Sequence, residues 1–170
     1  MVPLSRATLI ILVATYSFGQ QREFELKNLK FKGVEFSTTK ETIIRTFGKG
    51  KRVETNYECG FFTNDQPGGP YYKLVYDHFN FIGSDKETFY LQNVSLDDKG
   101  MIKINYNDKE LTGLTTKEEF VKIFGEKAKE HFDKFPNQDT LILYSKGNDG
   151  GGRFTFKNGR LSSWEYWTPC

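Results

Sequence analysis

Two segments of the chain space their hydrophobic residues as one face of a helix does. In residues 38–48, and again in residues 115–125, apolar side chains stand one and four positions apart. Side chains at this spacing lie on the same helix face. We therefore expect two short amphipathic helices with these residues facing the core: Ile43, Ile44 and Phe47 in the first, and Phe120, Val121 and Phe124 in the second.

The same segments carry signals for where a helix begins and ends. Thr38 and Thr115 are candidate N-caps, and a glutamate follows each of them three positions later, at Glu41 and Glu118. A threonine and a glutamate at this spacing form a capping box, which satisfies free N–H groups of the first turn. A glycine closes each segment, as expected for the residue of positive φ that follows many helices.

After each expected helix, the hydrophobic pattern changes to the alternation that is typical of strands. The expected strands are residues 71–81, 88–96, 101–106, 141–145, 153–157 and 161–167. Asn158-Gly159 is a dipeptide typical of a two-residue hairpin turn. Residues 126–135 fit either a further short helix or an extended segment.

The first helical segment recurs in the second half of the chain. Residues 28–48 (NLKFKGVEFSTTKETIIRTFG) align without gaps with residues 105–125 (NYNDKELTGLTTKEEFVKIFG). We interpret the match as an internal duplication, with units at residues 20–100 and 101–170. The predicted fold class is α+β: two tandem repeats of a helix and antiparallel strands, which share one sheet and place their helices on one face.

The first 19 residues have the features of a secretory signal peptide. Arg6 supplies a positive charge, residues 7–14 are apolar, and Ser17 and Gly19 place small residues near a cleavage site. We expect cleavage after Gly19, which would release a protein into the periplasm or the medium. No cysteine lies immediately after the expected cleavage site, so we expect no lipoprotein anchor.

The chain has two cysteines, Cys59 and Cys170. In an oxidising compartment, one disulfide between them is the simplest interpretation. A bridge that closes the long loop between residues 59 and 170 would raise the free energy of unfolding by about 4 kcal/mol in the chain-entropy model. Two free thiols, or an intermolecular bridge through Cys170, are the alternatives.

Composition narrows the classes of function. The chain carries 24 Lys and Arg against 22 Asp and Glu, without the basic excess of a typical nucleic-acid-binding protein. Its 16 Phe, 9 Tyr and 2 Trp are many more aromatic residues than a disordered chain contains. We expect a folded protein whose partner is another protein, with no nucleic acid and no integral membrane segment.

The sequence contains no recognised catalytic or metal-binding motif. His78 follows Asp77 in an expected strand, where neighbouring side chains point to opposite faces and cannot pair. A structural histidine is the favoured interpretation. We expect no catalytic residues, no metal and no cofactor; an enzyme whose carboxylates converge from distant segments is the remaining alternative.

The C-terminal hairpin contains the best candidate for a binding site. With a two-residue turn at Asn158-Gly159, Lys157 pairs with Arg160 and Arg153 with Trp164, and Phe154, Phe156 and Leu161 face the core. The opposite, open face then carries Arg153, Lys157, Arg160, Trp164 and Tyr166. Arginine, tryptophan and tyrosine often anchor interfaces, and this register would place Arg153 over Trp164 as a cation–π pair. The alternative is an ordinary exposed sheet face with two packed aromatic residues.

A duplicated unit of capped helix, Phe-Gly stop and antiparallel strands resembles the β-lactamase-inhibitor-protein family. It is more distantly similar to the small lipoprotein of the outer-membrane β-barrel assembly machine. The first resemblance implies two tandem α/β units whose sheet forms an aromatic binding surface. One cysteine in each unit departs from that family, in which each unit typically has its own disulfide. We expect an inhibitor-like or immunity-like binding protein, with an accessory protein of the cell envelope as the alternative.

Overall fold

The protein is described here by a computed structural model that covers residues 23–58 and 60–170. The expected signal peptide and its cleavage site lie outside these residues. Within the described ranges, no helix is long and apolar enough to cross a membrane. The fold is α+β, as predicted, with short helices and antiparallel sheets.

Strands dominate the described part of the chain. The helical elements are η1 (Leu26–Asn28), α1 (Lys40–Phe47), α2 (Lys117–Phe124) and α3 (Glu126–Lys134). The strands are β1 (Leu29–Phe31), β2 (Val34–Glu35), β3 (Ser37–Thr38), β4 (Lys51–Glu54), β5 (Tyr72–Val75), β6 (Phe79–Gly83), β7 (Phe89–Ser95), β8 (Lys103–Tyr106), β9 (Lys109–Thr112), β10 (Thr140–Tyr144), β11 (Gly151–Lys157) and β12 (Arg160–Trp167).

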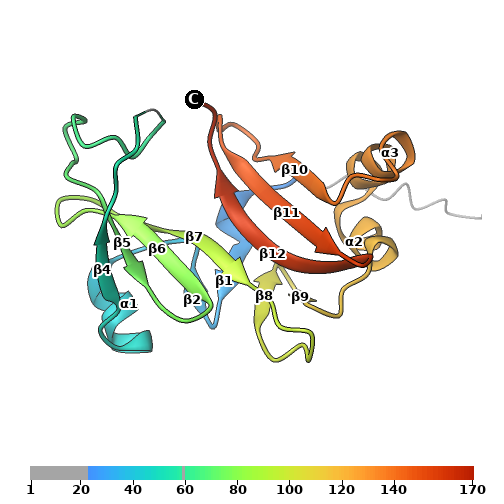
Figure 1. Ribbon diagram of the computed structural model, residues 1–170, viewed down its shortest axis with the longest axis horizontal. Helices are drawn as coiled ribbons and strands as arrows, with labels where there is room; N and C mark the ends of the chain where they lie inside the picture. The colour runs from blue at the N-terminus through green and yellow to red at the C-terminus, as the bar shows by residue number, and fades with distance from the viewer. Residues whose placement is uncertain (1–22, 59) are drawn as a thin grey trace, which may run out of the picture.

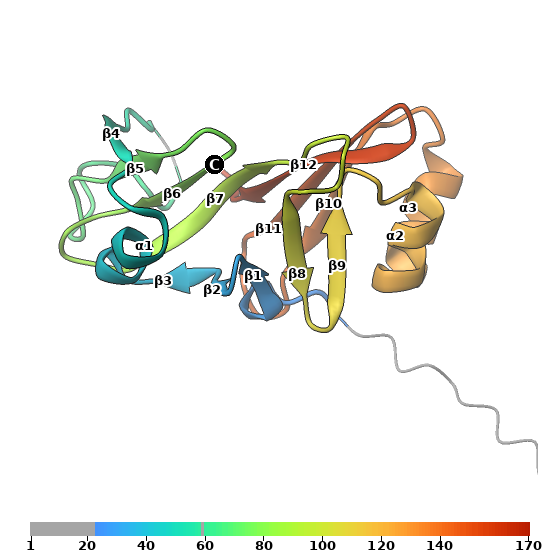
Figure 2. The ribbon, with the colours of Figure 1, turned by 90° about the horizontal axis from the view of Figure 1, so that it is seen from below.

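The strands form a small sheet and a large sheet. The small sheet has the order β2-β1-β8-β9, and the large sheet has the order β10-β11-β12-β7-β6-β5-β4, with β3 added beside β7. Figure 2 shows the small sheet and the helices on one side of the large sheet. We call this side of the large sheet its inner face, and the opposite side, which faces the viewer in Figure 1, its outer face.

The expectation of one shared sheet is correct for the large sheet and incomplete for the protein. The expected strand at residues 101–106 forms β8, but it pairs with β1 in the small sheet. The expected strand at residues 71–81 is two strands, β5 and β6, with a turn at residues 76–78. Residues 126–135, which the sequence left open, are helical through α3.

In each sheet, the two halves meet through one antiparallel pair of strands. In the small sheet, Lys30 pairs with Asn105, flanked by the pairs Leu29–Tyr106 and Phe31–Ile104. In the large sheet, Val94 pairs with Trp164, flanked by the pairs Asn93–Glu165 and Ser95–Ser163. A two-fold rotation about the middle pair exchanges the strands of each ladder, as in any antiparallel pair, and it matches Lys30 with Asn105 and Val94 with Trp164. The boundaries of the two units in sequence remain a prediction.

The two halves differ by two residues between the hairpin and the helix. The turn Lys32-Gly33 of the first hairpin corresponds to Asn107-Asp108 of the second. The separation in sequence between the two turns is two residues shorter than the separation between the two helix starts, Lys40 and Lys117. The ungapped sequence match is therefore correct for the helices and out of register for the hairpins.

Each helix begins one residue later than the sequence suggested. The N-caps are Thr39 and Thr116, whose hydroxyls accept the N–H groups of Thr42 and Glu119. Only α2 has a capping box, because Glu119 occupies its third position whereas α1 has a threonine there. The glycines after both helices have positive φ, 77° at Gly48 and 72° at Gly125, as expected.

Candidate functional site

A β-bulge changes the register of the C-terminal hairpin. Phe156 pairs with Leu161 as expected, but Thr155 pairs with Ser163, so Ser162 is an extra residue in β12. The Ser162 hydroxyl donates a hydrogen bond of 3.0 Å to the Thr155 carbonyl. Beyond the bulge, each residue of β11 faces a residue one position later than predicted.

The shifted register moves Trp164 from the outer face to the core. Trp164 pairs with Phe154 and is 0% exposed, so its predicted place on an open face is wrong. Tyr166 is only half exposed, and its ring lies 5.0 Å from that of Phe36 and 6.1 Å from that of Phe62. Burial raises the pKa of Tyr166 to about 12. Neither side chain offers an open aromatic surface.

The three predicted cations lie in different places. Arg153 is on the outer face, where its guanidinium is 3.1 Å from the Glu165 carboxylate and not over Trp164. Lys157 pairs with Arg160 as predicted, and both are exposed at the far end of the hairpin, beside the turn. The three cations therefore keep their expected face of the hairpin, but the structure does not bring them together with Trp164 and Tyr166.

A row of cross-strand neighbours follows the outer face through all the paired strands. Its members, from β10 to β4, are Ile142, Arg153, Glu165, Asn93, Asn80, Val75 and Lys51. Cross-strand partners share a face, so all seven belong to the outer face. The adjacent inner row, by contrast, is buried and consists of Leu141, Phe154, Trp164, Val94 and Phe79.

Two aromatic residues missed by the sequence reasoning lie at one end of the outer face. Tyr144 and Trp167 flank Gly151, and because Gly151 has no side chain their rings meet at 5.4 Å. Tyr144 is 60% exposed. Alternation with the buried Leu141 and Leu143 could have revealed Tyr144. Trp167 could not be placed without the bulge.

A loop adds a third aromatic residue above the outer face. Residues 55–71 connect β4 to β5, and Tyr57 in this loop lies against two outer-face side chains. The Tyr57 hydroxyl accepts a hydrogen bond from the Gln92 amide, and the Lys73 ammonium is 5.3 Å from the Tyr57 ring centre. Phe61, in the same loop, is 45% exposed.

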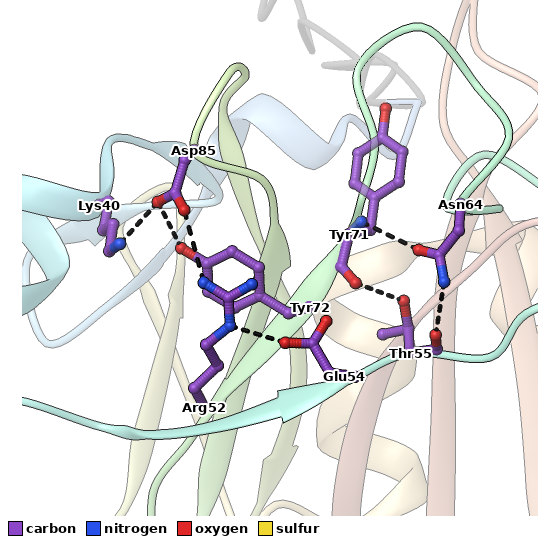
Figure 3. A network of polar contacts seen from close by, with 8 residues as sticks. All are labelled: Lys40, Arg52, Glu54, Thr55, Asn64, Tyr71, Tyr72 and Asp85. Carbon is purple, nitrogen blue, oxygen red and sulfur yellow. Dashed lines mark hydrogen bonds and ion pairs between the residues drawn. The ribbon is translucent and has the colours of Figure 1, made fainter.

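Hydrogen bonds at its base hold this loop in place (Figure 3). The Asn64 side chain donates to the Thr55 carbonyl and accepts from the Tyr71 N–H, at 2.9 and 3.1 Å. The Thr55 hydroxyl donates to the Tyr71 carbonyl at 2.8 Å. These bonds join the first residue of the loop that carries Tyr57 to the middle and to the last residue of the same loop.

A cluster of charges joins α1, β4 and β5 beside the loop (Figure 3). Asp85 lies 2.6 Å from the Lys40 ammonium and accepts a hydrogen bond of 2.6 Å from the Tyr72 hydroxyl. The Arg52 guanidinium stacks 3.7 Å above the Tyr72 ring. The hydrogen bonds from Lys40 and Tyr72 lower the pKa of Asp85. The positive and negative side chains of this cluster pair with one another, so we assign the cluster a role in stabilising the fold.

The described residues contain no cluster of side chains that could bind a metal ion. No three His, Cys, Asp or Glu side chains among them are placed to hold a metal ion. His78 is in the β5–β6 turn and not in a strand as expected, and it is exposed. The Nε2 atom of His131 lies 3.0 Å from the Thr140 carbonyl, which gives this ring a structural bond to the edge strand β10.

The predicted disulfide cannot be described, because Cys59 lies outside the described residues. No cysteine within the described ranges is free. The neighbouring residue, Gly60, lies against the C-terminal tail: a β-carbon added to it would be 3.3 Å from the Thr168 hydroxyl. The Cys59–Cys170 bridge remains a prediction that this proximity favours.

Comparison with protein-family models, with curated proteins and with solved structures found no match to this chain.

Proposed function

We propose that this is an exported protein-binding module, inhibitor-like or immunity-like, that contacts its partner through the outer face of the large sheet. The observation that carries the proposal is the composition of that face. Arg153, the exposed Tyr144 and the partly exposed Trp167 lie on this face, and the exposed Tyr57 lies against it. These are the residue types that dominate binding energy at interfaces. The opposite side of the sheet beneath them is buried.

The central polar residues of the face suit a contact that forms and dissociates in water. Arg153 and Glu165 retain 36% and 42% side-chain exposure in their ion pair, so a partner can bond to either of them. A permanent subunit interface would be more apolar at its centre. We expect a partner that exists on its own and presents polar groups around an apolar patch.

The test uses the mature chain, residues 20–170, immobilised as bait for proteins from the medium and envelope of the producing cell. The bait variant Tyr144→Ala, Arg153→Glu removes one outer-face ring and reverses one charge. Its matched control, Phe135→Ala, Lys122→Glu, makes the same kinds of change at exposed positions on α2 and after α3.

We expect a soluble protein that binds the wild type and the control and is lost from the outer-face variant. Equal recovery on all three baits would contradict the outer face as the contact surface. Recovery of membrane complexes instead of a soluble protein would contradict the inhibitor-like role and favour an envelope accessory.

A further inference from the structure

Each half of the molecule contains the same triad of aromatic rings. The two-fold relation of the registers matches Phe31 with Tyr106 and Phe79 with Phe154, and the helices match Phe47 with Phe124. In the first half, the rings of Phe31, Phe47 and Phe79 lie 4.7 to 6.0 Å apart. In the second half, Phe124 lies 4.9 Å from Tyr106 and 5.3 Å from Phe154.

In the second half, a phenylalanine from another segment packs against all three rings of the triad. Phe24 is 4% exposed, and its ring lies 5.4 Å from Tyr106 and 5.9 Å from both Phe124 and Phe154. Its backbone is held as well, because the Phe24 carbonyl accepts the Lys146 N–H at 3.0 Å. The acidic neighbour Glu23 pairs with the Lys146 ammonium at 2.9 Å.

In the first half, no described segment corresponds to residues 23–25. Tyr76, from the β5–β6 turn, covers part of the triad, with its ring 4.6 Å from Phe79 and 5.8 Å from Phe47. A cavity of about 550 Å³ remains beside the triad, and Phe31 and Ile102 contribute to its apolar lining. The smaller cavity beside Phe24 measures about 380 Å³.

The charged residues that line the first-half cavity are mainly basic. Lys32 and Lys49 stand against a single acidic residue, Asp77, and His78 also lines the cavity. The Lys32 ammonium lies 5.7 Å from the Phe31 ring centre and 6.0 Å from that of Phe79. Within the described ranges, neither Lys32 nor Lys49 forms an ion pair. These cations are therefore available to a ligand.

We propose that this cavity binds an aromatic side chain of an extended partner segment in which acidic residues flank that side chain. Residues 23–25, Glu-Phe-Glu, show the arrangement in the second half: the ring fills the triad and an adjacent carboxylate pairs with a lysine. In the first half, Lys32 and Lys49 take the place of the lysine partner. The inference does not depend on partner binding at the outer face, with which the cavity lining shares Val75.

The test is a titration of the isotope-labelled mature protein with the acetylated, amidated peptide Glu-Glu-Phe-Glu-Glu, followed by amide chemical shifts. We expect saturable shifts at Lys32, Lys49 and His78. A peptide with alanine in place of phenylalanine should bind about tenfold more weakly or worse, and added salt should weaken binding further.

Variants locate the site. Lys32→Glu, Lys49→Glu should lower the affinity at least about tenfold, whereas the control Lys122→Glu, Lys134→Glu, on exposed helix positions, should bind as the wild type does. All four positions are exposed, so each variant is expected to fold, and its own spectrum verifies this. The proposal is overturned by absent or unsaturable shifts, by equal affinity for the alanine peptide, or by shifts confined to the surroundings of Phe24. Equal binding of phenylacetate alone would assign the cavity to small aromatic anions and also overturn it.

Discussion

Trp164 is fully buried at the point where the two halves of the large sheet meet. It pairs with Val94 of β7 on one side and with Phe154 of β11 on the other. Its indole N–H has no hydrogen-bond partner within the described ranges. Because this ring is buried without a partner for its N–H, we attribute its stabilising contribution to the volume with which it fills the junction.

We predict that Trp164→Ala lowers the free energy of unfolding by about 3–5 kcal/mol, through lost burial and the cavity that remains. Urea denaturation followed by circular dichroism measures the change. Arg153→Ala, one strand away on the outer face, is the control and should cost less than about 1 kcal/mol. A Trp164→Ala variant as stable as the control would contradict the observed register.

The two N-cap threonines support a second prediction. Thr39→Ala and Thr116→Ala should each destabilise the protein by about 1 kcal/mol, and Thr116→Ala by more, because it also disrupts a capping box. The same urea measurements apply. Thr38 is paired in β3, so Thr38→Ala serves as the comparison. A loss of stability in Thr38→Ala, with none in Thr39→Ala, would indicate that Thr38 is the N-cap and that the helix begins one residue earlier.

At the scale of elements, bulges set which side chains face outward. β12 has one at Ser162, and the matching strand β7 has one at Gln92, where Phe81 pairs with Leu91 and Asn80 with Asn93. Each bulge lies near the β7–β12 junction and re-aims the residues that follow it. This is why an ideal two-residue hairpin misplaced Trp164.

Deleting Ser162 should therefore be tolerated far better than deleting a residue of the partner strand. Without the extra residue, Thr155 still pairs with Ser163 and Phe154 with Trp164, so Trp164 stays in the core. Deleting Thr155 instead would turn Phe154 toward the outer face. We expect a cooperative thermal transition in the Ser162 deletion and its loss in the Thr155 deletion. Ser162→Ala keeps the bulge, loses one hydrogen bond and should cost about 1 kcal/mol. A Ser162 deletion without a cooperative transition would contradict this register.

The charge cluster between α1, β4 and β5 predicts a pH dependence. Because Lys40 and Tyr72 lower the pKa of Asp85, its ionised form stabilises the folded state at neutral pH. That contribution should begin to fall near about pH 4, where the carboxylate titrates in the unfolded state, and disappear only below the lowered pKa of the folded state, where it is protonated in both states. We expect wild type to be more stable than Asp85→Asn at pH 7 and the difference to shrink toward pH 3. Urea denaturation at low ionic strength measures it, and a difference independent of pH would contradict this assignment.

For the whole molecule, the sequence predicted the elements better than their assembly. The α+β class, the helices and most strands of the large sheet followed from periodicity, because each signal is local. The small sheet was missed: β1 and β2 have only three and two residues, too few to show an alternating pattern. The pairing of β1 with β8 joins residues far apart in sequence and leaves no local signal.

The candidate site was predictable only in its chemistry. An open face with tryptophan, tyrosine and arginine was expected and is present, but it uses Trp167 and Tyr144 where the ideal hairpin gave Trp164 and Tyr166. Tyr57 reaches this face from a loop whose position depends on Asn64 and Thr55. Such contacts between segments have no periodic signature in the sequence.

The affinity of the captured partner for two tryptophan variants shows whether the partner binds through the outer face. Trp164 and Trp167 are three positions apart on opposite faces of one strand. Isothermal titration calorimetry should find Trp167→Ala folded and weakened about 30-fold or more, as for an interface hot spot. The conservative core variant Trp164→Phe should bind within about threefold of wild type, because its position is remote from the partner. Unchanged affinity in Trp167→Ala, or an equal loss in both variants, would contradict binding through the outer face.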